Sequence, residues 1–365
     1  MCLCVSKKCL GVSKKIYVLY KTEKMTYQQL IKFSKNLLLK AGLSKKKARI
    51  VAKTLVEADL LGHQTHGLQL LEAYLTEIEK GGMRTKGQPK VLRKKGAMTV
   101  WNGRYLPGPW LVEKAIDKAI KKAKKDGTAT IVIQKSHHIA CLAAYLEAVT
   151  KHNLMILLAC SDPMNSTVAP YGGTKGVYSP NPLAIGIPTT GEPILIDISM
   201  STTSNALIAQ KNRASEKLPH KWLLDNQGEI TDDPSTFLAT PPATILPLGG
   251  LDTGYKGFGL GIMIEALTNA LSGFGRAKKP TRWGASVFLQ IIDPRLLGDS
   301  FMDEMTFFKE ECLKSTPIRL ENPIRMPGSK GLLLKKKQLE NGLELRPSIV
   351  EAMERLALKY DIPLA

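Results

Sequence analysis

The apolar residues of the chain recur with a helical period near its N-terminal end. Apolar positions three and four residues apart predict three helices joined by short turns, over 26–42, 44–62 and 65–81. Thr26 and Gln29 have the spacing of a capping box, so the first helix is predicted to begin at Thr26. The pattern therefore predicts a helical N-terminal module.

Further along the chain, short β-branched runs alternate with helical stripes. The runs predict strands over 98–101, 128–133, 154–159, 183–187, 194–196 and 286–293. The stripes predict helices over 112–125, 141–152, 262–272, 303–314 and 347–360. This alternation is typical of the α/β fold class.

The strand, helix and strand over 128–159 predict a polar site at one edge of the sheet. In a βαβ unit the strands 128–133 and 154–159 would be parallel neighbours. His138 and Asp162 would then lie at the carboxyl ends of these strands, where open α/β sheets bind ligands. The imidazole of His138 can give or take a proton near neutral pH, which makes it a candidate acid or base. Taken alone, a helix cap or a bond to a loop carbonyl explains His138 at least as well.

Length and composition limit the classes of protein. The 365 residues exceed one ordinary core, so two domains or one large α/β domain with an appendage are expected. No apolar run reaches the ~18 residues of a spanning helix, so no membrane association is expected. Residues 1–24 carry six Lys and three Cys with a single acid, which predicts a disordered extension and leaves a targeting segment open. Six cysteines without framework spacing indicate a reducing, cytoplasmic location.

Two groups have the residue types of a metal site but lack supporting ligands. Cys2, Cys4 and Cys9 are three thiols on the predicted extension, and His63 and His66 could share a helical face. No acidic ligand cluster accompanies either group, so no metal is predicted. His66 is interpreted instead as a polar residue at a helix N-terminus that faces a cleft.

The charge balance raises the question of nucleic-acid binding. The chain has 52 Lys and Arg against 32 Asp and Glu, a formal net charge of +20. The lysines are spread along the chain, however, and Lys121, Lys122, Lys124 and Lys125 lie on the polar side of a predicted helix. No zinc-finger, RNA-binding or basic-zipper pattern accompanies them. A nucleic-acid partner is therefore not predicted, and attraction of an anionic cofactor or small-molecule substrate is the milder interpretation.

Two further stretches have features of nucleotide sites. Asp197 directly follows a predicted strand, where an acid can accept from a ribose hydroxyl, although it more often caps a turn. Residues 248–261 place close glycines around Lys256 and Gly257 before a helix, which would leave amides free to approach phosphate. The glycine spacing is not that of the dinucleotide fingerprint.

Several short motifs occur in the order, and at nearly the spacings, of one enzyme family. They are Thr65-His66-Gly67, Ser136-His137-His138, Ser161-Asp162-Pro163, Tyr171-Gly172-Gly173, Asn181-Pro182-Leu183-Ala184, Asp197, Asp232-Asp233-Pro234, Lys256-Gly257-Phe258-Gly259, Ile292-Asp293-Pro294 and Pro327-Gly328. Their collinearity from Met25 to the C-terminus resembles the malate/L-lactate dehydrogenase family of NAD(P)-dependent oxidoreductases. That family includes ureidoglycolate and sulfolactate dehydrogenases and a cyclic-imine carboxylate reductase.

The resemblance implies a fold unlike the ordinary Rossmann domain. It implies a non-Rossmann nucleotide-binding and catalytic domain on a mixed central sheet, over 96–324. It also implies that 25–95 and 325–365 join in a helical dimerisation domain, so a homodimer is expected. The implied reaction exchanges hydride between NAD or NADP and a 2-hydroxy or 2-oxo acid, or a related imine.

The resemblance also implies roles for individual residues. His138 resembles the family's general base, and His66 and Thr65 resemble its substrate-side His and Ser. Asp162 would contact the substrate, and Arg282 matches a substrate-contacting Arg of some members. The cofactor would contact Ser161, Asn181, Asp197, Lys256 and Gly257.

The chain departs from the family pattern around the substrate. Leu70 stands where the family usually has an Arg that grips the substrate carboxylate, and Ile139-Ala140 replaces Phe-Gly after the catalytic His. Two hypotheses follow, an active dehydrogenase with an altered substrate and a catalytically degraded member that acts as a nucleotide-binding or dimeric interaction protein. Neither the choice between NAD and NADP nor the substrate follows from the sequence.

Overall fold

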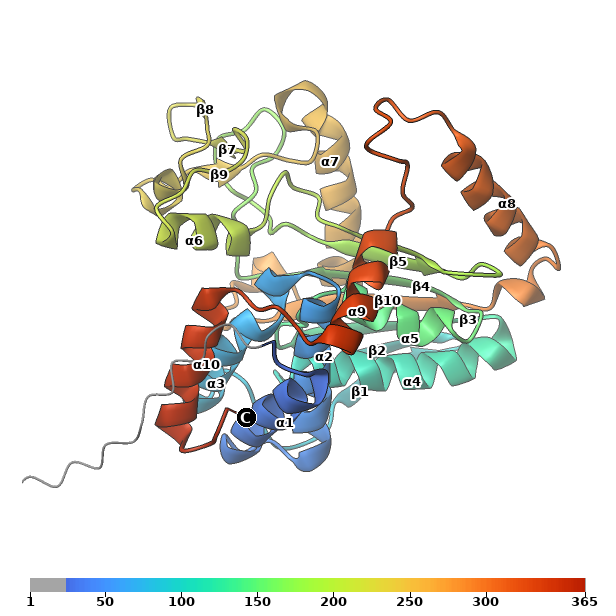
Figure 1. The fold of residues 1–365 in the computed structure, drawn as a ribbon, viewed down its shortest axis with the longest axis horizontal. Helices are drawn as coiled ribbons and strands as arrows, with labels where there is room; N and C mark the ends of the chain where they lie inside the picture. The colour runs from blue at the N-terminus through green and yellow to red at the C-terminus, as the bar shows by residue number, and fades with distance from the viewer. Residues whose placement is uncertain (1–23, 365) are drawn as a thin grey trace, which may run out of the picture.

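The computed structural model describes residues 24–364, so the predicted extension and Cys2, Cys4 and Cys9 lie outside the described residues. A seven-stranded sheet in the order β1-β2-β3-β10-β4-β5-β6 forms the centre of the molecule (Figure 1). Its strands are β1 (Lys90–Lys95), β2 (Met98–Asn102), β3 (Thr128–Ser136), β4 (Met155–Ser161), β5 (Leu183–Ile187), β6 (Ile194–Ile198) and β10 (Ala285–Ile292). Only β2 and β3 pair in parallel, and the other neighbours pair antiparallel. The predicted α/β class with a mixed central sheet is confirmed.

The prediction that β3 and β4 are neighbours is wrong. They run in the same direction, but β10 lies between them and pairs antiparallel with both, so that Leu289 is opposite Ile131 on one side and Leu158 on the other. Because β3 and β4 run in the same direction, the chain between them still crosses from one end of the sheet to the other. The predicted helix over 141–152 is only a 3₁₀ turn, Ala143–Tyr145, and the single-turn helix α5 (Glu147–Thr150).

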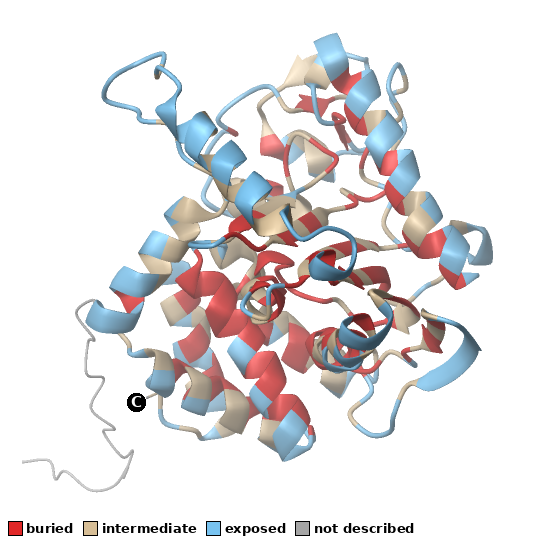
Figure 2. Cartoon of the chain, turned by 90° about the vertical axis from the view of Figure 1, so that its right-hand side faces the viewer, coloured by how far each residue is buried: buried red, intermediate tan, exposed pale blue. Residues whose placement is uncertain are grey.

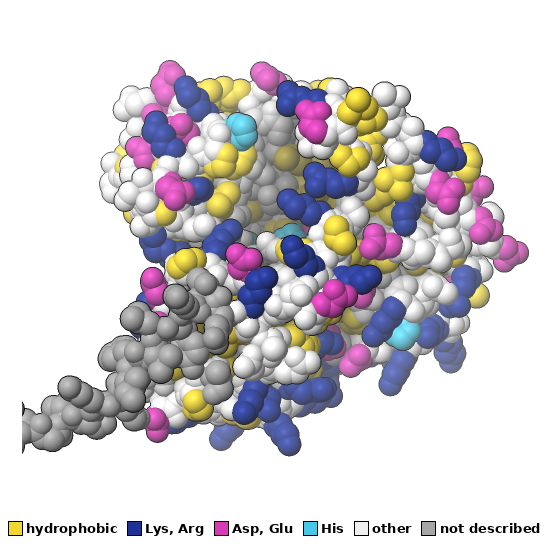
Figure 3. Space-filling view, in the orientation of Figure 1, with side chains coloured by type: hydrophobic (Ala, Val, Ile, Leu, Met, Phe, Trp, Pro, Cys, Tyr) yellow, Lys and Arg dark blue, Asp and Glu magenta, His cyan; other side chains and the backbone are white. Residues whose placement is uncertain are grey.

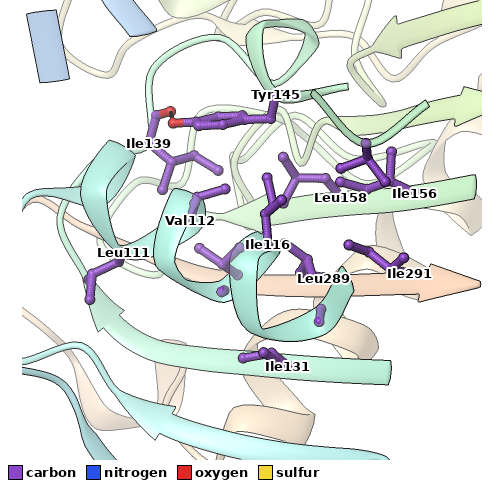
Figure 4. Close-up of a cluster of buried hydrophobic side chains, with 14 of the residues drawn as sticks. Leu111, Val112, Ile116, Ile131, Ile139, Tyr145, Ile156, Leu158, Leu289 and Ile291 are labelled. Atoms are coloured by element: carbon purple, nitrogen blue, oxygen red, sulfur yellow. Dashed lines mark hydrogen bonds between the residues drawn. The ribbon is translucent and has the colours of Figure 1, made fainter. Parts of the chain in front are cut away.

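Helix α4 (Gly108–Asp126) covers one face of the sheet. Its apolar stripe, with Leu111, Val112 and Ile116, packs on strand residues such as Ile131 and Leu158 (Figure 4). Lysines occupy its opposite side, so the periodicity of the sequence decides which face is buried. Figure 2 shows the buried residues gathered on the sheet and on the helices beside it.

A second core lies among helices from both ends of the chain. It is built by α1 (Tyr27–Lys40), α2 (Lys45–Leu60), α3 (Leu71–Glu79) and α10 (Pro347–Tyr360), and α10 lies against α1 and α3 (Figure 1). Helix α9 (Ser329–Asn341) contacts α2. The sequence pattern did not predict α9 or β1. Because β1 pairs with β2, the predicted domain boundary at residue 95 passes between two strands of the sheet.

The remaining elements complete the upper part of the molecule in Figure 1. They are α6 (Asn205–Arg213), the small sheet β8-β7-β9 (Ile230–Thr231, Leu223–Leu224, Thr244–Ile245), α7 (Gly250–Glu265) and α8 (Phe301–Lys314). Among residues 24–364, no helix combines the length and the apolarity needed to cross a membrane.

The prediction of a glycine-rich loop over 248–261 is wrong. Residues from Gly250 onward form α7, which continues into a π-helical turn, Ala266–Ala270. The glycines serve close packing: a Cβ at Gly257 would lie 2.3 Å from the Leu248 carbonyl oxygen, and one at Gly261 would lie 2.7 Å from the ring of Tyr178. In a helix most of these amides bond to carbonyls of the preceding turn and are not available to a phosphate.

Candidate active site

A cavity of about 810 Å³ lies between the ends of the central strands, α6 and the turn that follows α2. Six of the ten predicted site residues line it, namely Thr65, His66, His138, Asp162, Asn181 and Asp197, and Leu70 lines it as well. Figure 3 shows a recess between the segments that hold α6 and α7, with basic side chains along its edge. The structure therefore brings most of the predicted site together.

Four predicted site residues do not line this cavity. Ser161 is fully buried behind it, and Lys256 and Gly257 lie within α7. Arg282 donates to the carbonyls of Gly81 and Gly82, both at 2.7 Å, and its guanidinium lies over the ring of Tyr105. Lys256, which the resemblance assigns to the cofactor, therefore does not line the cavity that holds His138.

His138 belongs to a group of packed rings that we name the aromatic wall: Tyr74, His137, His138 and Trp283. Trp283 stacks on His138 with ring centroids 4.9 Å apart, and the edge of Tyr74 meets both His137 and His138. The Tyr74 hydroxyl lies 2.9 Å from His138 Nδ1 and 3.1 Å from the His138 carbonyl oxygen. These contacts fix the plane of the imidazole.

Burial keeps the histidines of this region neutral. Burial, and then the neighbouring His66 and His137, lower the pKa of His138 well below its usual value. Burial and His63 lower the pKa of His66 to about 4. The pKa of His137 falls to about 3 by burial and the nearby charge of Arg282, so its 3.5 Å contact with Glu77 is a hydrogen bond of a neutral ring rather than an ion pair.

Asp59 anchors the turn that carries Thr65 and His66 by a hydrogen bond to the backbone that follows it. Asp59 accepts from the Leu68 N–H at 2.8 Å, and burial raises the pKa of its carboxyl to about 8. A Cβ at Gly67 would lie 2.2 Å from Asp59 Oδ1, so only glycine allows this approach. At the tip of the turn, Thr65 Oγ1 lies 3.0 Å from His66 Nδ1.

The backbone of His138 is fixed by a second close approach. A Cβ at Gly108 would lie 2.2 Å from the His138 carbonyl oxygen and 2.4 Å from that of His137. Because Gly108 begins α4, the loop that holds His137 and His138 rests directly on the first turn of the helix that covers the sheet. The same loop holds Ala140 at a φ of 60°, a backbone conformation that favours glycine.

A second group, which we name the ionic wall, comprises Ser161, Asn181, Glu265, Asn269 and Arg276. Arg276 donates to both carboxylate oxygens of Glu265 at 2.9 to 3.2 Å. Ser161 and Asn181 donate to Glu265 Oε1 at 2.7 and 3.0 Å. Burial favours a raised pKa at Glu265, but the bonds and charge of Arg276 outweigh it, and the pKa of Glu265 is lowered.

The ionic wall fixes Asp162 through its backbone. Arg276 donates to the Asp162 carbonyl at 3.0 Å, and the Asp162 side chain accepts from the Met164 N–H at 2.9 Å and from Asn165. Burial outweighs these bonds and raises the pKa of Asp162. Asp162 is thus presented to the cavity in a rigid loop.

Asp197 lies at the end of β6 and accepts from the Ala143 N–H at 2.8 Å and from the Cys141 thiol at 3.6 Å. Burial raises the pKa of Asp197, with smaller opposing effects of His63 and these hydrogen bonds. Its position at a strand end agrees with the sequence pattern.

The cavity is poor in positive charge. Among the described residues that line it, Arg213 at the end of α6 is the only Lys or Arg side chain. Leu70, the residue that replaces the family's Arg, faces this cavity. The apolar substitution therefore lies where the resemblance places the substrate.

Sequence reasoning missed Tyr74, Trp283, Glu265 and Arg276. Tyr74 follows Leu70 by one helical turn, so the period of α3 could have placed it on the same face. Glu265, the last residue of α7, and Arg276, which follows the π-helical turn, meet Ser161 of β4 only in the folded chain, and no local pattern signals that contact.

The chain matches the family model described as malate/L-lactate dehydrogenase over residues 25–354. It is 30% identical to malate/(S)-sulfolactate dehydrogenase of Methanothermus fervidus, over 88% of this chain and 94% of that protein. It is 31% identical to ureidoglycolate dehydrogenase (NAD(+)) of Escherichia coli O157:H7, over 70% of each. It is 27% identical to (2R)-3-sulfolactate dehydrogenase (NADP(+)) of Chromohalobacter salexigens, over 86% and 90%.

Among solved structures, malate dehydrogenase of Entamoeba histolytica superposes with a TM-score of 0.87 at 24% identity, covering 94% of this chain and 99% of that one. At this identity the likeness concerns the fold. It agrees with the mixed sheet and the helical region described above.

Proposed function

The chain belongs to the malate/L-lactate dehydrogenase family, and on this premise we propose that it is an NAD(P)-dependent oxidoreductase of 2-hydroxy and 2-oxo acids or related imines. The observation that carries the proposal is the placement of His138, a neutral imidazole held by Tyr74 at the wall of the cavity of about 810 Å³. Thr65 and His66 line the same cavity. No observation favours the alternative of a catalytically degraded member.

His138 would move the proton. Oxidation of an alcohol requires a base for the hydroxyl proton, and a base must itself be unprotonated at the working pH. The tautomer that leaves Nε2 free requires Nδ1 to donate to the Tyr74 oxygen at 2.9 Å instead of accepting from the Ala140 N–H, which lies 3.3 Å away. The Tyr74 hydroxyl then donates to the His138 carbonyl oxygen. Tyr74 is therefore a positioning residue. Thr65 and His66 would orient the substrate oxygens, with Asp162 beside them.

The residues present fit a nicotinamide nucleotide. A cavity of about 810 Å³ lies within the range of small-molecule sites. Asp197 offers a carboxylate for a ribose hydroxyl, and Arg213 offers the one cationic side chain in the described lining. The Asn181 amide bonds to Ser179, Gly261 and Glu265, so Asn181 would support the cofactor site by holding its wall in place. The nicotinamide, when bound, supplies the hydride donor or acceptor. Because one relative is named for NAD(+) and another for NADP(+), the proposal leaves NAD and NADP as alternatives.

We further propose that the protein acts in the cytoplasm as a homodimer. The described cysteines Cys141, Cys160 and Cys312 are free thiols, as in a reducing compartment. Large apolar side chains are exposed on helices of the outer surface, including Phe307 and Phe308 of α8 and Leu333 of α9. Apolar exposure of this kind supports association with a second copy. Sedimentation equilibrium of the full chain would report a monomer mass if this part is wrong.

The test of the proposed function is a titration with NADH and with NADPH, followed by a panel of 2-oxo acids and cyclic imine carboxylates. Loss of reduced-nicotinamide absorbance is the readout. We expect saturable binding of at least one nucleotide and turnover of at least one acid or imine that His138→Ala abolishes. Nucleotide binding without turnover of any of these compounds would instead support the degraded-member hypothesis.

A further inference from the structure

His63 and Cys141 have no part in the proposed hydride chemistry, yet their side chains meet Asp197 at the cavity. One ligand atom from each of the three, a nitrogen, a sulfur and a carboxylate oxygen, all lie within 4.8 Å of one another. His63 comes from the turn after α2, Cys141 from the loop after β3 and Asp197 from β6. Three segments far apart in the sequence thus place mixed donors around one point.

Among the described residues, no Lys or Arg side chain balances the carboxylate of this group. Asp197 accepts from a backbone amide and a thiol, both neutral donors. Within the described part of the chain, it forms no ion pair with a Lys or Arg. A largely buried carboxylate beside a fully enclosed thiol is costly to ionise without a cation. A bound cation would supply the missing charge.

We propose that His63, Cys141 and Asp197 bind one divalent transition-metal ion, with Zn²⁺ as the expected occupant. Thiolate, imidazole and carboxylate together form a donor set for zinc, whereas Mg²⁺ and Ca²⁺ prefer oxygen ligands alone. The Ala143 N–H already orients the carboxylate at 2.8 Å, as outer hydrogen bonds do around metal ligands. On binding, the Cys141 S–H bond breaks, a Zn–S bond forms, and one proton is released. Three protein ligands leave a fourth coordination position open.

The site has a consequence for the enzyme, and this step rests on the proposed function. All three residues line the cavity in which the nucleotide is proposed to bind. Asp197 cannot serve a zinc ion and a ribose hydroxyl in the same geometry. Zinc and the nucleotide therefore oppose each other's binding, and zinc inhibits the enzyme reversibly.

The site is tested first without nucleotide. The full chain is used with Cys2, Cys4 and Cys9 changed to serine, so that these thiols contribute no signal. Co²⁺ is the spectroscopic probe, because a thiolate ligand gives it a charge-transfer band, and Zn²⁺ affinity is measured by competition with a chelating indicator. We expect one equivalent bound with a thiolate band.

Two substitutions and two controls decide the ligands. Cys141→Ser should abolish the thiolate band, and His63→Ala should weaken zinc binding by ~100-fold or more, since even outer-sphere substitutions cost 10- to 100-fold. Cys160→Ser removes a neighbouring thiol of the same cavity, and His220→Ala removes an exposed imidazole; both should bind zinc as the parent does. A thiolate band that persists in Cys141→Ser, or zinc affinity unchanged by either ligand substitution, overturns the site.

A second titration measures NADH affinity with and without zinc. We expect zinc to weaken NADH binding, a chelator to restore it, and Cys141→Ser to lose the effect. NADH affinity unchanged at saturating zinc overturns the antagonism. A protein that gives the cobalt band but binds neither NADH nor NADPH contradicts the proposed function, while the metal site stands.

Discussion

The aromatic wall borders the cavity through His138 and Trp283, the ionic wall borders it through Asn181, and the two groups are stabilised by different physics. In the aromatic wall, Tyr74, His137, His138 and Trp283 hold each other by ring contacts 4.9 to 6.0 Å apart, and the imidazoles are neutral because they are buried. In the ionic wall, the Arg276 and Glu265 charges are retained because each has several hydrogen-bond partners.

The difference separates two requirements of the reaction. A proton-transfer group must change its charge during turnover, so it lies where no fixed charge dictates its protonation state. The groups that position Asp162 and Asn181 must not change charge, so they are anchored by an ion pair. Substitutions in the two walls should accordingly affect different observables, activity for the aromatic wall and stability for the ionic wall.

The largest effect is expected from the aromatic wall itself. His138→Ala removes the proposed base and should lower turnover by roughly 10²- to 10⁴-fold, the usual contribution of a positioned acid or base. Nucleotide affinity and the thermal midpoint should change little. His220→Ala, on an exposed histidine, is the control and should retain activity. Unchanged turnover in His138→Ala would transfer the role to another group, of which His66 is the nearest candidate.

Breaking the ionic wall should instead destabilise the fold. Arg276→Met leaves the Glu265 carboxylate without its cation and should lower the free energy of unfolding by about 3 kcal/mol, the lower end for a broken buried pair. Arg355→Met breaks an exposed pair with Glu72 and should cost less than ~1 kcal/mol. Urea midpoints measure both. Adding Glu265→Gln to Arg276→Met should recover part of the loss.

The same pair has a defined pH dependence. The folded-state pKa of Glu265 is lowered from its ordinary value of 4.5, so its contribution is present above that pH and is lost on further acidification. The stability difference between the parent protein and Arg276→Met should therefore shrink below about pH 4.5. A constant difference would show that the pair is not what the substitution disturbs.

Leu70 places no positive charge in the cavity where the resemblance implies an Arg. A carboxylate clamp of two hydrogen bonds to a charged group contributes on the order of 1.5–3 kcal/mol per bond, and Leu70 offers none. We therefore expect poor use of malate, lactate and pyruvate. Leu70→Arg should raise kcat/KM for such acids by tenfold or more.

Two control measurements show whether a gain in Leu70→Arg comes from a charge that lines the cavity. Gln69→Arg adds the same charge next to the cavity without lining it, and should give no gain. Leu70 also packs against the helical core, so the thermal midpoint of Leu70→Arg must be compared first. Vigorous turnover of malate by the unaltered protein would refute this interpretation of Leu70.

Acidification should also destabilise the region of the aromatic wall and the neighbouring His66, and this loss should begin at a higher pH than the loss from the ionic wall. The pKa of His66 is lowered to about 4 and that of His137 to about 3, against 6.5 for an ordinary histidine. The unfolded chain then binds more protons below pH 6.5, so stability falls as the pH falls toward 4, by at most about 1.4 kcal/mol per pH unit for each group. His66→Asn should flatten this slope, and His220→Asn should not.

The two walls also differ in how far the sequence predicted them. The strand 128–133, the Ser136-His137-His138 motif and the Thr65-His66-Gly67 motif are local patterns, and the structure brings them to one cavity. The ionic wall could not be found in this way. Its acid, Glu265, ends α7 and its Arg follows the π-helical turn, and both meet Ser161 of β4 through the packing of this region on the strand, which no local period indicates.

The Gly-rich stretch shows the opposite failure, a local pattern that misled. Close glycines permit either a phosphate loop or close helix packing, because both need a missing Cβ. In this chain the glycines serve close helix packing, because Leu248 and Tyr178 fill the space beside Gly257 and Gly261. Those partners are contacts of the folded chain, so the sequence pattern alone could not choose between the two interpretations.

The smallest expected effect tests how the aromatic wall sets the tautomer of His138. Tyr74→Phe keeps the ring and its contact with Trp283 but removes the hydroxyl that lies 2.9 Å from Nδ1. Without the Tyr74 oxygen, a proton on Nδ1 has no hydrogen-bond acceptor. The population of the tautomer with a protonated Nε2 therefore rises, and in that tautomer Nε2 cannot act as a base. The loss of one neutral hydrogen bond, ~0.5–1.5 kcal/mol, should lower kcat by roughly two- to tenfold, change KM little and move the pH profile of kcat/KM.

Tyr145→Phe is the matched control, because its buried hydroxyl bonds to the Ile139 carbonyl beside the same loop. That control should lose stability while keeping the pH profile, and a Tyr74→Phe protein that did the same would reduce Tyr74 to a structural role.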